Sequence, residues 1–472
     1  MSPVTPKHLG QSSSPATQNL FFEDQRDSGT LLRVLGVGFG LAVTIGGTIG
    51  MGILRTPGEV AKELPTPSLF IGIWIAGGIY ALLGAISVAE LGAMIPRSGG
   101  FYIFAHRALG DYAGFVVGWS DWLSTCGTLA VISLVVGEYT GDLIAPLAGR
   151  TKAIALVVVL LFAALQWRGI RWGSFTQNVT SALKALIFAA FAVAAFTHGA
   201  KGGTEAALPA PHNLALFAAM IVALQSVLYT YDGWYGVIYF GEEVRNPKRD
   251  VTASMFGGVL AVIAIYLLVN LAVLRVLPMS KIAGNNLAVG AATEAIFGAY
   301  GGMAIGALAI LSLLSTINAY TLTGPRILYA MSADRLLPQH AARVNRGGTP
   351  TITLFISTLA AALFILRGFK EVLDALAFFF VANYTMAYIS LIVLRRREPD
   401  LPRPYRAWGY PWTTAIVLIG SIAFLAGAVM TDLINHSKDS VHALVILAVS
   451  YPIYLLIRLA SRPRSQHSGK QN

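Results

Sequence analysis

Twelve long apolar stretches, separated by short polar or basic loops, run through the 472 residues of this chain. A helix needs about 20 apolar residues to cross the roughly 30 Å hydrocarbon core of a bilayer. The sequence therefore predicts an all-α integral membrane protein with twelve transmembrane helices. The stretches cover about 34–60, 68–92, 112–144, 153–167, 176–197, 214–240, 255–277, 292–330, 351–366, 372–394, 410–431 and 440–460.

The charge of the chain agrees with a membrane protein. Only 12% of the residues are charged, against about 25% in soluble domains, and the formal net charge is +11. Alternating the twelve stretches across the bilayer puts the main basic clusters on one face, which predicts cytoplasmic termini and no nucleic-acid partner. The clusters are Arg245, Lys248 and Arg249; Arg326, Arg335, Arg343 and Arg346; and Arg395–Arg397 with Arg403 and Arg406.

The remaining sequence predicts one membrane domain over residues 29–460, with cytoplasmic tails at 1–28 and 461–472. The first tail is polar, rich in Ser and Pro, and lacks the regions of a signal peptide, so we expect disorder there. Cys126 is the only cysteine, which excludes an intrachain disulfide. No phosphate-binding loop and no metal-ligand spacing occur, so the sequence predicts neither an enzyme nor a cofactor or metal site.

Two of the stretches contain helix-breaking sequences. Residues 45–53 hold four glycines within seven positions, each costing a helix about 1 kcal/mol relative to alanine. Residues 229–235 hold Asp232 and Gly233 at a similar depth. Because the two lie five stretches apart, they predict inverted repeats over about 34–197 and 214–394, followed by two extra helices within 410–460. Close helix packing through Gly46 and Gly50 is the alternative explanation of the glycines.

Four short motifs occur in order along the chain and carry a resemblance to a known family. They are Gly50-Met51-Gly52-Ile53, with Met51 where the family has serine; Ala89-Glu90-Leu91 through Pro96-Arg97-Ser98-Gly99-Gly100; Tyr231-Asp232-Gly233-Trp234 followed by Glu242 to Arg249; and Arg403-Pro404-Tyr405-Arg406 with Gly409-Tyr410-Pro411. The chain resembles the amino acid–polyamine–organocation (APC) superfamily, and within it the L-type amino acid transporters and their prokaryotic relatives.

The resemblance implies a leucine-transporter-type 5+5 inverted repeat in which helices one and six are unwound mid-membrane. It also implies secondary active transport of neutral L-amino acids across a plasma or bacterial inner membrane by alternating access. Exchange and proton coupling both remain open. Phe101 stands where many relatives carry a carboxylate, which weakens a gating charge there. No cysteine lies in the loop after the third stretch, so we expect no disulfide-linked heavy chain.

An unwound helix exposes backbone groups that could bind the carboxylate and the ammonium group of an amino acid. The helix half after Gly50 offers free N–H groups and a positive dipole end, which suit a carboxylate. Free carbonyls before the break and around the second break suit an ammonium group. The resemblance maps carboxylate contacts onto Gly50, Met51 and Gly52, and amine contacts onto Thr48, Ile49, Tyr229 and Asp232. Thr230, Gly233 and Trp234 complete the candidate set.

Several side chains in the candidate set have two possible roles. Asp232 could serve the substrate through its backbone or cap the second half of its helix with its side chain. Tyr229 and Trp234 could gate the site or only pack. We expect Glu242 and Glu243, which lie near Arg245, to form a cytoplasmic salt-bridge gate. The alternative is that these charges are only solvated at the membrane interface.

Lys184 is the candidate coupling residue. It lies about eight residues into the fifth stretch, roughly 12 Å from its end at 1.5 Å per residue. Its long stem could snorkel to the interface, but an ionisable residue inside a membrane span is a functional candidate. The stretch resembles relatives in which a lysine replaces a sodium ion beside the unwound first helix. A proton is therefore the coupling partner that the resemblance allows, and sodium is not expected.

Other polar residues in the apolar stretches point to structural roles. For Asp121 and Glu138 we expect pairing or nearness to the outer surface. Hydrogen bonds between helices, or an ion site, could involve Ser312, Ser315, Thr316 and Asn318. Competing functions are a channel, which would need a continuous polar pore, an amino-acid-binding membrane sensor, and a transporter of cationic amino acids or polyamines.

Overall fold

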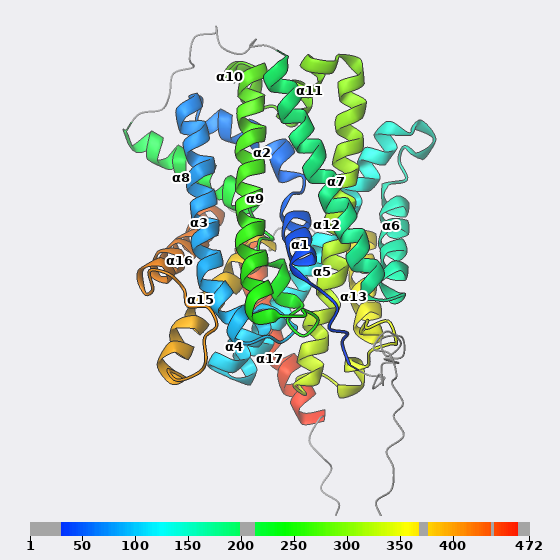
Figure 1. Cartoon of the computed structure of the whole chain (residues 1–472), viewed down its shortest axis with the longest axis vertical. Helices are drawn as coiled ribbons and strands as arrows, with labels where there is room; N and C mark the ends of the chain where they lie inside the picture. The colour runs from blue at the N-terminus through cyan, green and yellow to red at the C-terminus, as the bar shows by residue number, and fades with distance from the viewer. Residues whose placement is uncertain (1–29, 199–212, 368–375, 436–438, 461–472) are drawn as a thin grey trace, which may run out of the picture.

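The computed structural model describes residues 30–198, 213–367, 376–435 and 439–460, and within these ranges the chain is helical and forms no strand. The predicted tails lie outside these residues. Figure 1 shows the helices running roughly between two ends of the molecule. The helices are α1 Val37–Thr48, α2 Gly52–Glu63, α3 Pro67–Met94, α4 Phe101–Leu109, α5 Asp111–Leu143, α6 Thr151–Trp167, α7 Ile170–Thr197, α8 Asn213–Thr230, α9 Pro247–Val276, α10 Met279–Ile282, α11 Ala288–Phe297, α12 Ala299–Ala333, α13 Thr351–Arg367, α15 Leu376–Arg397, α16 Trp412–Asn435 and α17 Asp439–Ala460.

Nine helices in the described ranges are long and apolar enough to cross a membrane, and the bent pair α1 and α2 makes a tenth. Two further predicted spans correspond to the apolar helices α6 and α13, which have 17 residues each. The described residues therefore confirm an all-helical chain with about nine or ten helices that could span a membrane, and the count of twelve remains a prediction. The inverted repeat remains a prediction.

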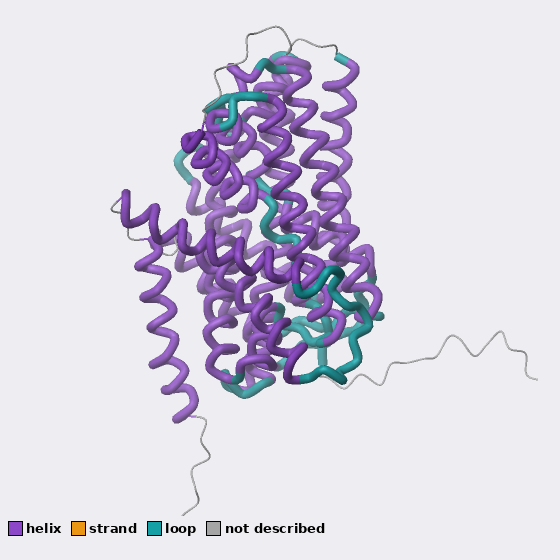
Figure 2. The backbone as a smooth tube through the Cα atoms, turned by 90° about the vertical axis from the view of Figure 1, so that its left-hand side faces the viewer, coloured by secondary structure: helices purple, strands orange, loops and turns teal. Residues whose placement is uncertain are grey.

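The helix break predicted at residues 45–53 is present. α1 ends at Thr48, α2 begins at Gly52, and the two axes differ by 47°. In the predicted sixth span, α8 ends at Thr230, and a turn over residues 231–235 leads into η2, the short 3-10 helix Gly236–Tyr239. The second half of this stretch is therefore not α-helical. Figure 2 shows such non-helical backbone inside the helical body, between its two ends.

The two breaks lie directly against each other. Gly233 has φ +100°, and a Cβ atom there would be 2.8 Å from the carbonyl carbon of Gly47. Only glycine fits this position, because a side chain would meet backbone that cannot move aside and L-residues rarely adopt that φ. Contact between the turns brings segments almost 190 residues apart in sequence into one site.

The described chain starts, and α17 ends, at the same end of the molecule, here called the terminal face (Figure 1). Backbone bridges close this face. The Leu35 N–H donates to the Glu243 carbonyl at 2.9 Å, and the Arg245 N–H donates to the Leu35 carbonyl at 2.7 Å. A second bridge joins Ser98 to Phe240. The segment after η2 is thus fixed to the start of α1 and to the loop between α3 and α4.

Charged side chains on the terminal face add to this closure. Asp334, just after α12, accepts hydrogen bonds from Arg97 at 2.8 Å and Tyr102 at 2.9 Å. Burial alone would raise the pKa of the Asp334 carboxyl, but hydrogen bonds from His106 and Arg97 outweigh it and lower that pKa to about 2. The same carboxylate raises the pKa of His106. A charged cluster therefore holds α12 against α4 at neutral pH.

Candidate functional site

A cavity of about 670 Å³ lies beside the two helix breaks. Its outer part contains the exposed side chains of Arg55 and Glu59 on α2, which runs toward the end opposite the terminal face (Figure 1). A volume of this size fits a small organic solute. Seven of the ten predicted substrate residues line it: Thr48, Gly50, Met51, Gly52, Tyr229, Thr230 and Asp232.

The start of α2 presents backbone donors to this cavity. Met51 is the N-cap residue of α2, and no side chain caps this end. The first N–H groups of a helix have no partner within it, and the helix dipole makes them attractive to an anion. The Thr56 and Thr230 hydroxyls, 2.7 Å apart, tie α2 to α8 beside this end. The arrangement can bind a carboxylate without a full positive charge.

Lys184 lies against the first break. Its side chain is fully buried, and its Nζ donates to the carbonyls of Gly46, at 3.1 Å, and Ile49. It therefore does not snorkel to a helix end. The amine lies among α1, α7 and α12 and donates to carbonyls that the break has freed.

Hydroxyl groups from α12 complete this network. Ser312 donates to the Ile49 carbonyl and Thr316 donates to the Gly46 carbonyl, each at 3.0 Å. Ser315 instead joins Gln177, Thr180 and Ser181 on α7, and Asn318 donates to Gln177 and to the Gly173 carbonyl. Ser312 and Thr316 thus support the break, whereas Ser315 and Asn318 join helices.

The Ile49 carbonyl has no capacity left for a ligand, because Lys184 and Ser312 occupy both of its lone pairs. Ile49 is also fully buried and does not line the cavity. The Thr48 carbonyl accepts one hydrogen bond, from Tyr266 at 3.0 Å, and keeps one lone pair. Of the two predicted amine contacts before the first break, only Thr48 has a free site.

Tyr266 on α9 connects the two breaks. Its Oη lies 3.0 Å from the Thr48 carbonyl and 2.8 Å from the Thr230 carbonyl, which are the last residues of α1 and α8. The ring is buried and packs against Trp74 and Tyr231. The sequence analysis did not select Tyr266, although a buried phenol in an apolar stretch needs a hydrogen-bond partner.

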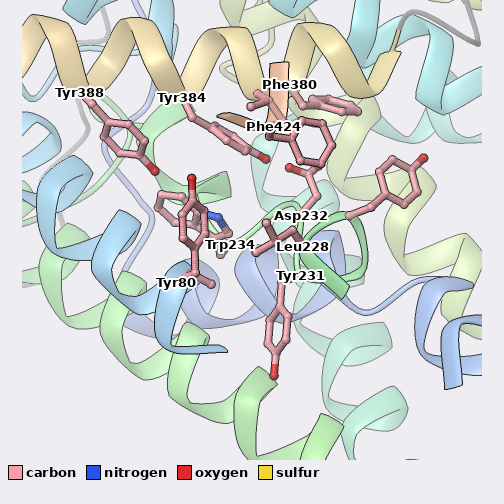
Figure 3. Close-up of a pocket in the computed structure, with 12 residues that line it drawn as sticks. Tyr80, Leu228, Tyr231, Asp232, Trp234, Phe380, Tyr384, Tyr388 and Phe424 are labelled. Atoms are coloured by element: carbon pink, nitrogen blue, oxygen red, sulfur yellow. The ribbon is translucent and has the colours of Figure 1, made fainter. Parts of the chain in front are cut away.

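Asp232 and Trp234 belong to a second, aromatic pocket. Figure 3 shows Asp232 and Trp234 with Tyr80, Phe380, Tyr384, Tyr388 and Phe424 around this space. Asp232 accepts from Tyr235 Oη at 3.4 Å and from the Gly233 backbone N–H, so its side chain bonds within the turn. The N-cap residue of η2 is Tyr235, and no side chain caps that helix. Trp234 is buried, and its ring lies tilted against Tyr384 with centroids 5.9 Å apart.

Gly233 lines neither of these spaces but a third, smaller one with Gly47, Tyr235 and Tyr320. Phe101, the position where a carboxylate was considered, packs on Tyr235 with ring centroids 4.7 Å apart and on Tyr384 at 5.7 Å. An aromatic layer thus lies between the second break and the terminal face.

The glutamates predicted to form a gate have other partners than expected. The Glu243 carboxylate is buried and pairs with Arg326 at 2.9 and 3.1 Å, so its partner is Arg326 and not the sequence neighbour Arg245. Glu242 accepts from the Ser98 N–H at 3.3 Å and lies 4.0 Å from Arg97. An arginine inside an apolar stretch is itself a signal for a buried partner.

The remaining acids of the third stretch differ in environment. Asp121 is buried, and its two carboxylate oxygens accept from Tyr239 Oη at 2.9 and 3.0 Å. Glu138 is exposed near the distal end of α5. Both positions agree with the structural roles expected for them.

A sequence model described as amino acid permease matches residues 40–455 of the chain. The chain belongs to the amino acid permease family. This confirms the resemblance to the APC superfamily. Together with the many membrane-spanning helices, it makes the chain a multi-pass membrane protein of amino acid transport and not an enzyme.

Curated relatives match over most of this permease. The serine/threonine exchanger SteT of Bacillus subtilis (strain 168) is 29% identical over 431 residues, covering 89% of this chain and 97% of the relative. The b(0,+)-type amino acid transporter 1 of Oryctolagus cuniculus is 25% identical over 392 residues, covering 81% and 80%. The Asc-type amino acid transporter 1 of Mus musculus is 25% identical over 451 residues, covering 93% and 83%.

Proposed function

We propose that this permease is a secondary active transporter of neutral L-amino acids that works by alternating access. The observation that carries the proposal is the juxtaposition of two elements at one break. The uncapped start of α2 faces the cavity, and Lys184 occupies the carbonyls on the other side of the same break. A substrate would therefore bind at the break in the first span, where the Lys184 amine donates to the unwound backbone. The printed names of the relatives, an exchanger and two amino acid transporters, support the same proposal.

The substrate would bind across the cavity between the breaks. Its carboxylate would accept from the N–H groups of Gly50, Met51 and Gly52, which line the cavity. Its ammonium group would donate to the free lone pair of Thr48 and to backbone oxygens near Tyr229 and Asp232. Thr230 is too engaged with Thr56 and Tyr266 to serve mainly as a ligand contact.

Lys184 would take the structural place of a coupling ion. Its amine already satisfies two backbone carbonyls, which is the role that a sodium ion would otherwise fill. Transport should then be independent of sodium. A lysine that stays charged favours obligatory exchange, whereas a lysine that releases a proton during the cycle favours proton coupling. The pH profile of Lys184→Ala separates the two.

The terminal face would be cytoplasmic, in a plasma or bacterial inner membrane, so that the described conformation faces outward. The basic clusters near Arg245 and Arg395–Arg397 support this orientation through the positive-inside rule. Glu243 and Arg326 would form the buried part of the inner gate, with Glu242 beside it and Tyr229 on the outer side of the site. We also propose the 5+5 repeat and no disulfide-linked heavy chain, since Cys126 is buried.

Uptake into proteoliposomes tests the function. Purified protein should take up neutral L-amino acids without sodium, and esters that lack the carboxylate charge should neither be transported nor compete. Preloading the vesicles with unlabelled amino acid separates an exchanger, which needs it, from a permease. Binding without uptake under any gradient would contradict transport and favour a sensor.

The orientation has its own test. Single cysteines at Ser2 and Asn472, in a background lacking Cys126, should react with an impermeant reagent only after cells are permeabilised. Labelling of either position from outside would overturn the topology.

Cationic amino acids are the second candidate substrate class. Glu59 and Asp232 both line the cavity, although Arg55 lies one turn from Glu59. Competition of lysine against leucine at equal concentrations distinguishes the two classes.

A further inference from the structure

A second polar pocket of about 280 Å³ lies on the terminal face, between the start of α1 and the first turns of α7. It is remote from the two helix breaks and shares no lining residue with the substrate cavity. Two arginines line it together with uncharged polar groups. Its lining residues are Val34, Arg171, Ser174, Phe175, Asn178 and Arg245.

The two arginines of this pocket are unpaired. Within the described ranges, neither the Arg171 nor the Arg245 guanidinium makes a hydrogen bond or an ion pair, and both side chains are exposed. The nearest acids in sequence are engaged elsewhere: Glu243 pairs with Arg326, and Glu242 bonds the Ser98 N–H. Two like charges on one pocket repel each other unless an anion lies between them.

Uncharged polar groups line the same space. The Ser174 hydroxyl, which donates to the Arg171 carbonyl at 3.1 Å, and the Asn178 amide line the pocket one and two turns beyond Arg171 on α7. Guanidinium groups bind phosphate oxygens in a bidentate way, and an amide group such as that of Asn178 adds a further donor. The chemistry of the lining therefore matches a phosphate group.

The surface of α7 beyond the pocket is apolar and exposed. Phe175 lines the pocket and is 63% exposed. At helical spacing behind it follow Val179, Leu183 and Leu186, which are 47%, 43% and 66% exposed. Trp172 is exposed beside Arg171, as expected for a tryptophan at the boundary between head groups and hydrocarbon. An acyl chain would therefore find an apolar face next to the phosphate donors.

We propose that this pocket binds the phosphate of an anionic phospholipid, with an acyl chain along the exposed face of α7. The arginines supply the charge, and the apolar face of α7 favours a lipid over a free phosphate. Because Val34 lines the pocket and Leu35 bonds both Glu243 and Arg245, the bound lipid would also hold the start of α1 closed against the terminal face.

The test compares lipids on the purified full chain in neutral detergent. Binding is measured by native mass spectrometry with phosphatidylglycerol, with phosphatidylcholine, and with inorganic phosphate as a competitor. The test variant is Arg171→Gln combined with Arg245→Gln. The matched control is Arg396→Gln, which removes an exposed arginine elsewhere, in the last turn of α15.

We expect phosphatidylglycerol to bind more tightly than phosphatidylcholine, and the double variant to lose this preference by about tenfold or more, at roughly 1 kcal/mol for each arginine. The control should keep it. Equal phosphatidylglycerol binding by wild type and double variant would overturn the proposal. If inorganic phosphate binds but phosphatidylglycerol is not preferred over phosphatidylcholine, the assignment of the bound phosphate to a lipid would be wrong. Unchanged melting temperatures of both variants confirm that the fold is intact.

Discussion

The two helix breaks lie against each other but are stabilised in different ways. At the first break, a buried ammonium and two hydroxyls from α12 donate to the carbonyls of Gly46 and Ile49. At the second break, the Thr230 carbonyl accepts from the Tyr266 phenol, and the Asp232 carboxylate lies 3.4 Å from Tyr235 Oη. Aromatic rings pack around the second turn.

This difference suggests that the two breaks have different roles in transport. Three side-chain donors hold the carbonyls of the first break, and bonds from a charged amine would be about twice as strong as neutral ones, so we expect this break to stay fixed. Aromatic packing can rearrange at lower cost than a buried charge can lose its partners. The first break should therefore fix the substrate backbone, and the second should move during transport.

The largest expected effect comes from filling the contact between the breaks. A Cβ atom at Gly52 would lie 2.8 Å from Thr230 Cγ2, so Gly52→Val should abolish uptake by displacing α8 and crowding the carboxylate site. Gly38→Ala, earlier in the same stretch, is the control, since no atom lies within 4 Å of its added Cβ. Undiminished uptake by the valine variant would contradict the site assignment.

Removing the charge from the first break should have the next largest effect. Lys184→Ala leaves the Gly46 and Ile49 carbonyls with fewer donors, and we expect uptake to fall by about tenfold or more, because losing a buried charged donor costs about 1.5–3 kcal/mol. Lys152→Ala, which removes an exposed bond to the Leu366 carbonyl, is the control.

The pH profile of the Lys184 variant separates the possible roles of the lysine. A fall in uptake at every pH indicates that the ammonium braces the break. Loss of pH dependence with exchange preserved indicates that the amine carries the proton. Uptake at wild-type rates would mean that the charge is dispensable, and a sodium requirement in the wild type would defeat the proposed replacement of an ion.

A smaller effect on substrate affinity is expected from removing the Tyr266 hydroxyl, the neutral donor that lies between the two breaks. Tyr266→Phe keeps the buried ring but removes its hydrogen bond, at a cost of about 1 kcal/mol, which corresponds to roughly a fivefold fall in apparent substrate affinity. Binding is measured by tryptophan fluorescence or a thermal shift. An affinity equal to that of the wild type would show that the breaks do not depend on this hydroxyl.

The smallest effect is expected at the second break alone. The Tyr235 hydroxyl lies 3.4 Å from both Asp232 oxygens, a long contact that contributes little. Tyr235→Phe should change uptake less than about twofold, and Tyr235→Ala should cost more because the ring packs on Phe101 and Tyr384. A larger loss in the phenylalanine variant would show that the second break also relies on hydrogen bonding.

Much of the fold followed from local sequence, because apolar length and glycine density act over short distances. The helices match the predicted stretches, and the break at residues 45–53 lies among the predicted glycines. The loss of α-helix after Thr230 was less predictable. It depends on Gly233 fitting against Gly47, a contact between distant segments that no local pattern records.

The site was predicted less completely, because hydrogen-bond partners are set by tertiary packing. Backbone positions such as Gly50 to Gly52 were found from their glycines, and they line the cavity. Three features each join residues from segments far apart in sequence: the saturation of the Ile49 carbonyl, the pairing of Glu243 with Arg326, and the bonds of Tyr266. Sequence spacing within one helix carries no information about such pairs.

Tyr266 has one hydroxyl proton but two carbonyls within reach, at the ends of α1 and α8. At any instant it can donate to only one of them, and the other must find a different donor. The two helix ends therefore compete for a single proton. The ammonium group of a bound substrate could donate to the Thr48 carbonyl in place of Tyr266. The Tyr266 hydroxyl would then donate to the Thr230 carbonyl, so its orientation would differ between the empty and the occupied site.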